Sequence, residues 1–394
     1  MAIELAPLPL PASADPSKFA DFGREVKGIH PGDLSPELFK EISEALYKHD
    51  ALLFRDVTLT PEQQYALTKA FDPQSESYGH GNNKTEGTKK SILHPDLKTI
   101  PRVPQVQLIG NGTVYNHEGL AEAMLKHPSH TTFHKSRVSV EDEAKGITRF
   151  YRWHIDAALY DLSPPKVTTL YGLKVPQGKE QVVRYDDGTG DELPVPLGTT
   201  AFVSGKTMFD ILPPELKSVA VRTKVRYAPH PYVWMAPARA LSTGLGIESD
   251  GLELPLNELP AWEESRVKTL PMVWKNPVTG NLHFQVHPCG AAELLIDPLP
   301  AGSKQEGALY PDGAHVKDLK EVRDLLYKMQ RPAIAPKARI VQREKDLVLF
   351  HNRGILHTVV GAFTPDQVRA FHQCNLAASD DPTGATEEDV KKWA

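Results

Sequence analysis

Apolar residues recur at helical spacing in two segments near the start of the chain. In SPELFKEISEALYKHD, residues 35–50, positions 38, 42 and 46 form one apolar stripe, and Ser35 is a suitable N-cap before a proline at the first helical position. In TPEQQYALTKAF, residues 60–71, Thr60 begins a capping box. The segment ALLFRDV between them, residues 51–57, is typical of a buried strand. We predict a helix–strand–helix start that packs on a sheet.

From about residue 145 onward, short strand patterns dominate. They are RFYRWHIDA (149–157), VTTLYGLKV (167–175), QVVRY (181–185), TTAFVSG (199–205), VRYAPH (225–230), LVLFHN (347–352) and QVRAFHQCNLA (367–377). The stretch VVRYDDGTGDELPV predicts a hairpin with a DDG-type turn. Two later helices are predicted over 213–222 and 318–330. Residues 73–104 and 236–312 are rich in loop signals, and a short polar tail follows residue 380.

Short strands with few helices and no alternating β–α rhythm favour a double-sheet architecture. We predict an α+β, mainly β fold: a double-stranded β-helix, or jelly roll, with flanking helices and long loop insertions. Residues 1–394 are treated as a single domain. It has an N-terminal α/β part over about 1–145 and a jelly-roll core over about 146–378, and the core contains an insertion over about 236–312.

Composition and charge narrow the class of protein. The chain has 394 residues and a net charge of −5, which gives no basic footprint for nucleic acid. The two cysteines, Cys289 and Cys374, are too few for a disulfide scaffold and fit a reducing compartment. No secretory leader and no apolar run long enough for a membrane span are recognised. We expect a cytoplasmic protein that acts on a small molecule, and the sequence leaves open whether it forms a homo-oligomer.

Candidate chemistry first appears in FYRWHIDAALY, residues 150–160. Alternate side chains of a strand share a face, so His154 and Asp156 would point the same way. A neutral imidazole beside a carboxylate supplies two adjacent ligands for a metal ion. The same spacing also fits a buried His–Asp hydrogen bond or two polar residues on a wet face, and the dipeptide spacing alone does not decide between them.

A second group of candidates lies in residues 347–377, which supply His357 or His351 and then Arg369. Two histidines and one carboxylate with open positions form the ligand set of non-haem Fe(II) oxygenases, although zinc sites of the same composition exist. A planar guanidinium binds a carboxylate bidentately, as an α-keto acid cosubstrate requires. Two amide side chains share the predicted strand face with Arg369. An inward polar ligand pocket explains this face, and so does an outward face of an edge strand.

HxD, a distal histidine and a following arginine resemble the taurine-dioxygenase-like family of Fe(II)/α-ketoglutarate-dependent oxygenases. The longer segments RFYRWHIDAALY, VRYDDGTG, VPLGTTAF, YAPHPYVWM, LPMVWKNP, DLVLFHNRGILH and QCNLAA are similar to those of fungal α-ketoglutarate-dependent xanthine dioxygenases. The similarity runs from about residue 20 to about residue 378.

The resemblance implies roles for individual residues. It implies that His154, Asp156 and His357 hold Fe(II), since the distal ligand of this family lies in an RxxLH segment, which here ends at residue 357. It also implies that Arg369 and the hydroxyl of Thr200 bind the far carboxylate of 2-oxoglutarate, and that O2 takes the last open position. Fe(II) is therefore the expected cofactor, and 2-oxoglutarate and O2 are the expected cosubstrates.

The resemblance further implies hydroxylation of xanthine at C8, giving urate, succinate and CO2. A flat purine dione needs amides and charges around its rim. The matching positions are Lys126, Glu141, Asp142, Gln373, Asn375 and, as a weaker candidate, Gln105. The loop EDEAKGIT is about one residue longer than in the resembling enzymes, which leaves open which of Glu141 and Asp142 faces the pocket. These two carboxylates and Lys126 are equally typical of solvated surface charges.

Three other functions remain open from the sequence. The same oxygenase chemistry on an amino acid or a sulfonate would keep the ligands and change the substrate. A non-catalytic jelly-roll binding protein would have no need of all four of His154, Asp156, His357 and Arg369. A zinc hydrolase would keep the metal ligands and would not need 2-oxoglutarate.

Overall fold

The computed structural model describes residues 3–9, 21–80, 98–127, 130–303, 307–335, 345–364 and 366–394. The part of the predicted 73–104 loop between residues 81 and 97 lies outside the described residues.

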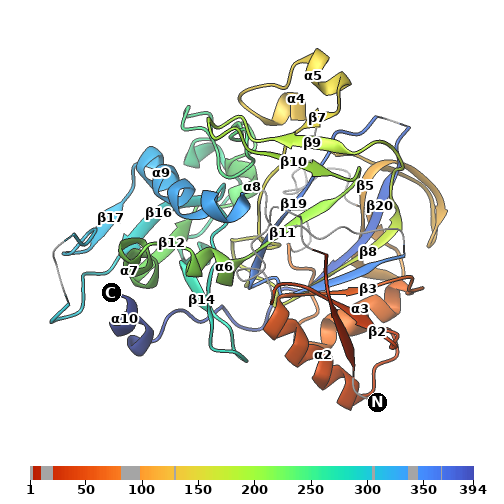
Figure 1. The fold of residues 1–394 in the computed structure, drawn as a ribbon, viewed down its shortest axis with the longest axis horizontal. Helices are drawn as coiled ribbons and strands as arrows, with labels where there is room; N and C mark the ends of the chain where they lie inside the picture. Colours follow the sequence, from red (N-terminus) through yellow and green to blue (C-terminus); the bar gives the residue numbers. More distant parts are fainter. Residues whose placement is uncertain are drawn as a thin grey trace.

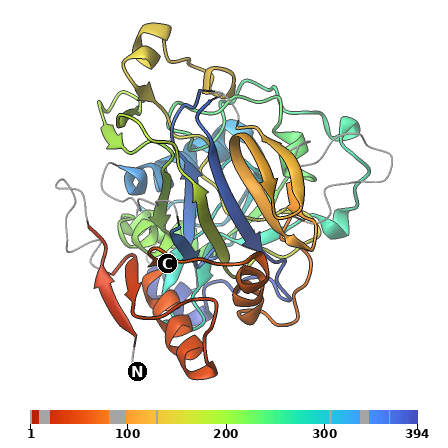
Figure 2. The same ribbon diagram turned by 90° about the vertical axis from the view of Figure 1, so that its right-hand side faces the viewer.

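The largest sheet brings distant parts of the chain together. Its strand order is β1-β2-β3-β18-β8-β20-β5-β4, and β6 pairs with β5. All pairs are antiparallel except the parallel pair β2–β3. Figure 1 shows the sheet on the right of the molecule, and Figure 2 shows the β5–β6 hairpin curving beside β20. The strands are β1 (Glu4–Pro7), β2 (Arg24–Lys27), β3 (Ala51–Phe54), β4 (Lys98–Ile100), β5 (Val103–His117), β6 (Leu120–Leu125), β8 (Thr168–Lys174), β18 (Leu347–Phe350) and β20 (Arg369–Asn375).

Two predicted helices cover one face of this sheet. Helix α2 (Pro36–His49) begins at the Ser35 cap, and α3 (Pro61–Ala70) begins at the capping box of Thr60. Their apolar residues, among them Leu46 of α2 and Leu67 of α3, pack with Phe54 and Leu349 from the sheet. The predicted helix–strand–helix start is confirmed because the caps and the apolar stripe agree with the face that is buried.

The opposite face of the sheet packs on the pair β11 (Thr200–Ser204) and β19 (Ile355–Val359). Phe202 of β11 and Ile355 of β19 share a buried cluster with Phe350 and Phe371 of the large sheet. The predicted hairpin is present as β9 (Gln181–Arg184) and β10 (Glu192–Val195), to which β7 (Ile147–Thr148) adds a parallel strand. Two sheets packed face to face, with helices outside, agree with the predicted α+β, mainly β class.

The region 236–312 contains more regular structure than its loop signals predicted. Within it, β13 and β16 pair with β12, which precedes the region, and β14 pairs with β15. Strand β17, which follows the region, completes the sheet β13-β12-β16-β17. Their bounds are β12 (Thr223–Tyr227), β13 (Thr269–Pro271), β14 (Val273–Lys275), β15 (Leu282–Phe284), β16 (Ala291–Ile296) and β17 (Ala314–Val316). Leu294 and Phe284 join the main buried cluster with Phe150, so this region is part of the core. The added strands have three to six residues, too short for a clear periodic pattern.

The remaining helices lie around the sheets. They are α4 (His130–Phe133), α5 (Val140–Ala144), α6 (Gly205–Asp210), α7 (Pro214–Arg222), α8 (Pro231–Trp234), α9 (Leu319–Gln330) and α10 (Glu387–Trp393). The polar tail after residue 380 contains a helix that was not predicted, α10, which begins with a capping box and packs on α7 and α6. Trp393 meets the ring of Phe209 edge-on at 5.5 Å.

The strand predicted over residues 149–157 is wrong. Residues 149–157 do not form a continuous strand and contain only isolated bridges, at Phe150 to Val360 and at His154 to His357. Beyond the second bridge, the backbone of Asp156 pairs with a side chain instead of a strand partner.

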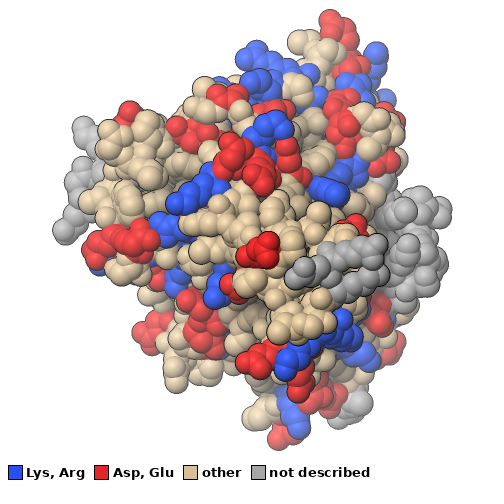
Figure 3. All heavy atoms as spheres, turned by 90° about the vertical axis from the view of Figure 1, so that its left-hand side faces the viewer, with Lys and Arg blue, Asp and Glu red and all other residues tan. Residues whose placement is uncertain are grey.

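Two surface features complete the description. In the described residues, no helix is long and apolar enough to cross a membrane. Figure 3 shows acidic and basic side chains interspersed on one face of the molecule, without a broad patch of one sign.

Candidate metal and cosubstrate site

Three predicted ligand residues meet between the two sheets. One ligand atom each from His154, Asp156 and His357 lies within 4.8 Å of the others. The Nε2 atoms of His154 and His357 are 3.7 and 3.5 Å from Oδ1 of Asp156. His154 and His357 come from distant segments, and their backbones pair in both directions, with N–H···O distances of 3.0 and 3.1 Å. This backbone pairing fixes the two imidazoles side by side.

Both imidazoles are held in the form that binds metal ions. Burial is the main cause that lowers the pKa of His154 and that of His357, so the neutral rings are favoured. Nδ1 of His154 lies 2.8 Å from the carbonyl oxygen of Arg152. If this nitrogen carries the proton, Nε2 is left as the free lone pair that faces Asp156.

The Asp156 carboxylate is oriented by two buried donors. The Thr168 hydroxyl donates to Oδ2 at 2.9 Å, and the amide of Gln373 donates to both oxygens at 3.2 and 3.1 Å. The Tyr78 hydroxyl in turn donates to Oε1 of Gln373 at 3.3 Å. Because these donors fix the carboxylate plane, the lone pairs that face the two imidazoles have a defined direction.

The backbone of Asp156 is held by the side chain of Asn352. Oδ1 of Asn352 accepts from the Asp156 N–H at 3.0 Å, and its Nδ2 donates to the Asp156 carbonyl at 2.8 Å and to that of Pro165 at 3.0 Å. The Gln285 amide donates to the Asn352 carbonyl at 2.9 Å. The turn between β18 and β19 therefore positions one ligand through Asn352 and leads directly into the strand that carries His357.

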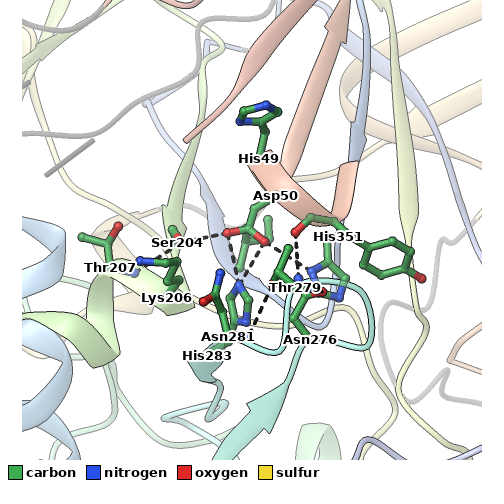
Figure 4. A network of polar contacts seen from close by, with 12 residues as sticks. His49, Asp50, Ser204, Lys206, Thr207, Asn276, Thr279, Asn281, His283 and His351 are labelled. Carbon is green, nitrogen blue, oxygen red and sulfur yellow. Dashed lines mark hydrogen bonds and ion pairs between the residues drawn. The ribbon is translucent and has the colours of Figure 1, made fainter. Parts of the chain in front are cut away.

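The other candidate from the sequence, His351, belongs to a different buried cluster. Its Nδ1 lies 3.3 Å from Oδ1 of Asp50, and Nε2 of His283 lies 3.1 Å from the same oxygen. The Ser204 hydroxyl donates to the other oxygen of Asp50 at 2.8 Å. Figure 4 shows these side chains converging on the Asp50 carboxylate. The geometry thus places His357, and not His351, beside His154 and Asp156.

A buried cation lies on the strand face that also carries Gln373. The guanidinium of Arg369 is 1% exposed, donates to the Gly198 carbonyl at 3.1 Å and to the Thr200 hydroxyl at 3.0 Å, and stacks over the Phe371 ring at 4.1 Å. Burial lowers the pKa of Arg369 to about 9, which still leaves the group charged at neutral pH. Within the described chain no carboxylate is paired with it, so an anionic ligand would supply the missing countercharge.

These residues fit Fe(II) and an α-keto diacid. Two neutral imidazoles and one carboxylate form the donor set of a facial triad, and Nε2 of each imidazole faces the Asp156 carboxylate. The uncompensated charge of Arg369, with the Thr200 hydroxyl beside it, matches the carboxylate at the far end of such a ligand. The donor set alone is equally compatible with zinc.

The residues predicted to bind substrate have different surroundings. Asn375 is fully buried, and both atoms of its amide lack a hydrogen-bond partner among the described residues. Gln373 is engaged with Asp156, as described above. Gln105 is half-buried on β5, where the register of Gln373 opposite Gln107 places it on the same sheet face as Asn375. Of these three residues, Asn375 is therefore the one whose amide is available to form hydrogen bonds with a ligand.

The three charged residues predicted to bind substrate are more exposed to solvent than Gln373 and Asn375. Lys126 follows β6 and is exposed, as is Glu141 on α5. Asp142 is half-buried and forms an ion pair with Arg184 at 2.9 Å. Their contact with substrate stays a prediction.

Sequence reasoning missed several residues that shape this site. Thr168 sits in a predicted buried strand, where a hydroxyl among apolar residues was a usable signal. Asn352 lies in the HNRG stretch of a segment that was already singled out for its histidines. Tyr78 gave no signal, because its neighbourhood reads as loop.

Comparisons with known proteins agree with this geometry. The family model described as "Taurine catabolism dioxygenase TauD, TfdA family" matches residues 9–375. The alpha-ketoglutarate-dependent xanthine dioxygenase xan1 of Schizosaccharomyces pombe is 51% identical over 392 residues, which covers 98% of this chain and 91% of that protein. The alpha-ketoglutarate-dependent xanthine dioxygenase xanA of Emericella nidulans is 51% identical over 382 residues, covering 96% and 98%. The xan-1 protein of Neurospora crassa, of the same description, is 50% identical over 380 residues, covering 94% and 87%.

Solved structures support the fold. A taurine dioxygenase from Burkholderia xenovorans has a TM-score of 0.52 at 16% identity, covering 98% of this chain and 93% of its own. AAD-2 in complex with Mn(II) and N-oxalylglycine has a TM-score of 0.55 at 16% identity, covering 97% and 100%.

Proposed function

The chain belongs to the TauD, TfdA family of dioxygenases, and from this premise we propose that it hydroxylates xanthine at C8 to give urate, with 2-oxoglutarate converted to succinate and CO2. It is an Fe(II)- and 2-oxoglutarate-dependent dioxygenase that uses O2. The identity of about 50% to three fungal proteins named as xanthine dioxygenases, over nearly the whole chain, is the observation that carries the choice of substrate.

The geometry above supports the roles that we propose for the metal-binding and cosubstrate-binding residues. His154, Asp156 and His357 would hold the iron, and Arg369 with Thr200 would bind the far carboxylate of 2-oxoglutarate. When bound, Fe(II) and 2-oxoglutarate together activate O2 and couple decarboxylation of the cosubstrate to insertion of oxygen into a substrate C–H bond.

The chain orients and shields this chemistry. Thr168 and Gln373 keep the Asp156 carboxylate turned toward the imidazoles. Phe202 and Phe350 pack against His357 with ring centroids 5.8 and 5.0 Å away, which excludes water from that side of the site. The two sheets thus supply a rigid, dry wall behind the ligands, and the substrate must approach from the other side.

Recognition of the purine is proposed to use polar atoms that have no hydrogen-bond partner among the described residues. The Asn375 amide offers one donor group and one acceptor, a match for a carbonyl and an N–H on the rim of xanthine. Gln373, Gln105, Lys126, Glu141 and Asp142 are proposed as further contacts by resemblance. Asn375→Ala is expected to raise the KM for xanthine and to leave the binding of 2-oxoglutarate intact.

The test of the proposed function is a substrate panel read out by release of succinate. Xanthine, an amino acid and a sulfonate are each incubated with the purified chain, Fe(II), 2-oxoglutarate and O2, and urate is measured in the xanthine reaction. We expect stoichiometric urate and succinate with xanthine alone. Succinate release that is indifferent to xanthine, but coupled to another substrate, would overturn the choice of substrate and leave the enzyme class intact.

The ligand assignment is tested separately by metal content. His154→Ala and Asp156→Ala are each expected to lose iron binding and turnover, because two protein ligands do not complete a facial triad. His351→Ala is the matched control, since its imidazole contacts Asp50 and not the triad. Normal iron content in Asp156→Ala would refute the assignment.

A further inference from the structure

A second cation, the guanidinium of Arg152, lies next to the proposed metal-binding residues. Arg152 precedes His154 by two residues. The N–H of Trp153 donates to the Gly244 carbonyl, and the N–H of His154 donates to the His357 carbonyl. Trp153 and Ile155 enter the main core, whereas Arg152 and His154 do not belong to it and are both half-buried.

The guanidinium of Arg152 is held between two aromatic rings. Its central carbon lies 5.1 Å from the ring centroid of Phe133 and 6.0 Å from that of Tyr232. The Tyr232 ring lies 5.6 Å from that of His287, which in turn lies 6.3 Å from that of His154. These contacts form a continuous wall of flat side chains that runs from Arg152 to the metal-binding histidine.

This wall borders a hollow in the molecule. Arg152, Phe133 and Tyr232 line a cavity of about 300 Å³, together with Thr132, Ala236, Ala238 and Arg239. A cavity of this size is at the lower end of the range for sites that bind small molecules. Of the two arginines that line the cavity, Arg152 is half-buried and Arg239 is exposed.

The charge of Arg152 lacks a countercharge in the part of the chain that the structure describes. No described carboxylate is paired with it, and its Nε is buried without a hydrogen-bond partner. Cys289 lies close to the guanidinium, but burial raises the pKa of this thiol, which therefore stays neutral. An unpaired, partly desolvated guanidinium is unfavourable unless a ligand supplies the negative charge.

We infer that Arg152 forms an anion subsite beside the metal centre, which binds the substrate as a flat, negatively charged purine with Phe133 and Tyr232 flanking the contact. The inference rests on the proposed function, since it concerns the substrate of the same site. The other buried cation, Arg369, is proposed to bind the cosubstrate together with Thr200, so each of the two arginines would bind a different anion. A guanidinium suits the planar anion because it offers hydrogen bonds in its own plane and a stacking face.

The inference is tested with Arg152→Met, Arg152→Lys and, as the matched control, Arg239→Met. Arg152→Met is expected to raise the KM for xanthine at least ten-fold, while the KM for 2-oxoglutarate and the iron content change less than two-fold. Arg152→Lys keeps the charge and loses the planar fork, so an intermediate KM is expected. Arg239→Met removes the same charge from the exposed rim of the cavity and is expected to change the KM less than two-fold.

The outcomes separate this inference from the proposed function. If the wild-type chain converts xanthine and Arg152→Met keeps its KM, or if Arg239→Met raises the KM equally, the subsite is refuted and the proposed function stands. If the wild-type chain does not convert xanthine, the proposed function fails. Binding of xanthine is then read anaerobically from the visible absorption band of the Fe(II)–2-oxoglutarate complex. Weaker binding by Arg152→Met than by the wild type supports the subsite, and equal or absent binding in both refutes it.

Discussion

At the scale of single residues, the buried guanidinium of Arg369 makes the clearest prediction. Arg369→Met removes the buried charge that we propose binds the far carboxylate of 2-oxoglutarate. The KM for 2-oxoglutarate is expected to rise about 100-fold, since truncating one partner of a buried charge pair costs at least ~2 kcal/mol. Iron binding is expected to persist, because the three ligands do not contact Arg369. Steady-state kinetics and metal analysis of the same preparation check both.

Thr200→Val is the graded control for this prediction. The Thr200 hydroxyl accepts from Arg369 and is neutral, so its loss is worth about 1 kcal/mol, or roughly a five-fold rise in the KM for 2-oxoglutarate. An Arg369→Met enzyme that saturates at the same 2-oxoglutarate concentration as the wild type would contradict the assignment of this pocket.

At the scale of elements, the turn between β18 and β19 carries the site. Asn352→Ala removes three hydrogen bonds, two of them to the backbone of Asp156. Fe(II) affinity is expected to fall about 10–100-fold, as when groups that orient a metal ligand are lost. Equilibrium titration of the apo chain with Fe(II) under anaerobic conditions measures this affinity.

Asn276→Ala is the matched control for the turn. Asn276 is also buried and makes three hydrogen bonds, to the Tyr47 carbonyl and to the N–H groups of Val278 and Thr279. Both substitutions are expected to destabilise the fold by about 1–3 kcal/mol, since each leaves buried groups unsatisfied. If Asn276→Ala weakens Fe(II) binding as much as Asn352→Ala, the effect is general destabilisation and not positioning of Asp156.

The Asp50 cluster joins four elements and predicts how stability depends on pH. Asp50 ends α2, and its carboxylate contacts His283 of β15, His351 of the β18–β19 turn and Ser204, the N-cap of α6. Burial alone would raise the pKa of Asp50, but the two imidazoles outweigh burial and lower the pKa below its usual value. The folded state therefore binds the proton less readily than the unfolded chain does. The ionised Asp50 carboxylate therefore adds to the free energy of unfolding above the pKa that Asp50 has in the unfolded chain, near 4. This contribution is lost as the pH falls below that value.

Asp50→Asn is expected to lower the free energy of unfolding by about 3 kcal/mol at pH 7, because it breaks a buried, hydrogen-bonded charge. The difference from the wild type is expected to narrow as the pH falls below about 4. Urea unfolding at a series of pH values measures it. Asp324→Asn, on an exposed helix pair with Lys320, is the control and is expected to cost less than about 1 kcal/mol at any pH. A wild-type advantage that stays constant down to pH 3 would contradict the role of the Asp50 charge.

Local signals predicted the elements that local interactions form. The caps at Ser35 and Thr60 and the apolar stripe of α2 are contained in consecutive residues, and the structure confirms them. The strands within residues 236–312 have only three to six residues, so their patterns were too brief to recognise, and β13 and β16 also depend on β12, a partner outside that region. Residues 149–157 show the same limit, because an Asn352 side chain replaces the strand partner that the alternating pattern predicted.

The residues of the candidate site were predictable where their combination is rare in sequences, and not where two equivalent residues lie close together. A histidine and a carboxylate two residues apart, with a distal histidine and an arginine, form a scarce combination, and the structure brings all of them into one region. The choice between His351 and His357 could not be made from spacing, because both flank the same turn. It is decided by Asp50, more than 300 residues away, which takes up His351.

At the scale of the whole molecule, the parts of the chain share cores. Strands β2 and β3 of the N-terminal part pair into the sheet that contains β8, β18 and β20, and β16 of the 236–312 region contributes to the main buried cluster. The proposed metal ligands join these parts, since Asp156 contacts Thr168 of β8 and Gln373 of β20, and His357 lies on β19. Binding of metal and cosubstrate is therefore coupled to the stability of the whole fold and not only to local order.

This coupling predicts a ligand-dependent shift in thermal unfolding. Fe(II) and 2-oxoglutarate, added anaerobically at 100 times their joint dissociation constant, are expected to stabilise the folded chain by about 2.7 kcal/mol. For a chain of this length the unfolding entropy converts that into a rise in Tm of roughly 3 °C. Differential scanning calorimetry measures the shift, and a chelator is expected to reverse it.

Asp156→Ala is expected to show no rise in Tm on addition of the metal. Arg369→Met is expected to respond to the metal and to gain little from 2-oxoglutarate. A Tm rise in Asp156→Ala equal to that of the wild type would place the metal outside the His154–Asp156–His357 site, because a chain without that carboxylate cannot bind it there with unchanged affinity.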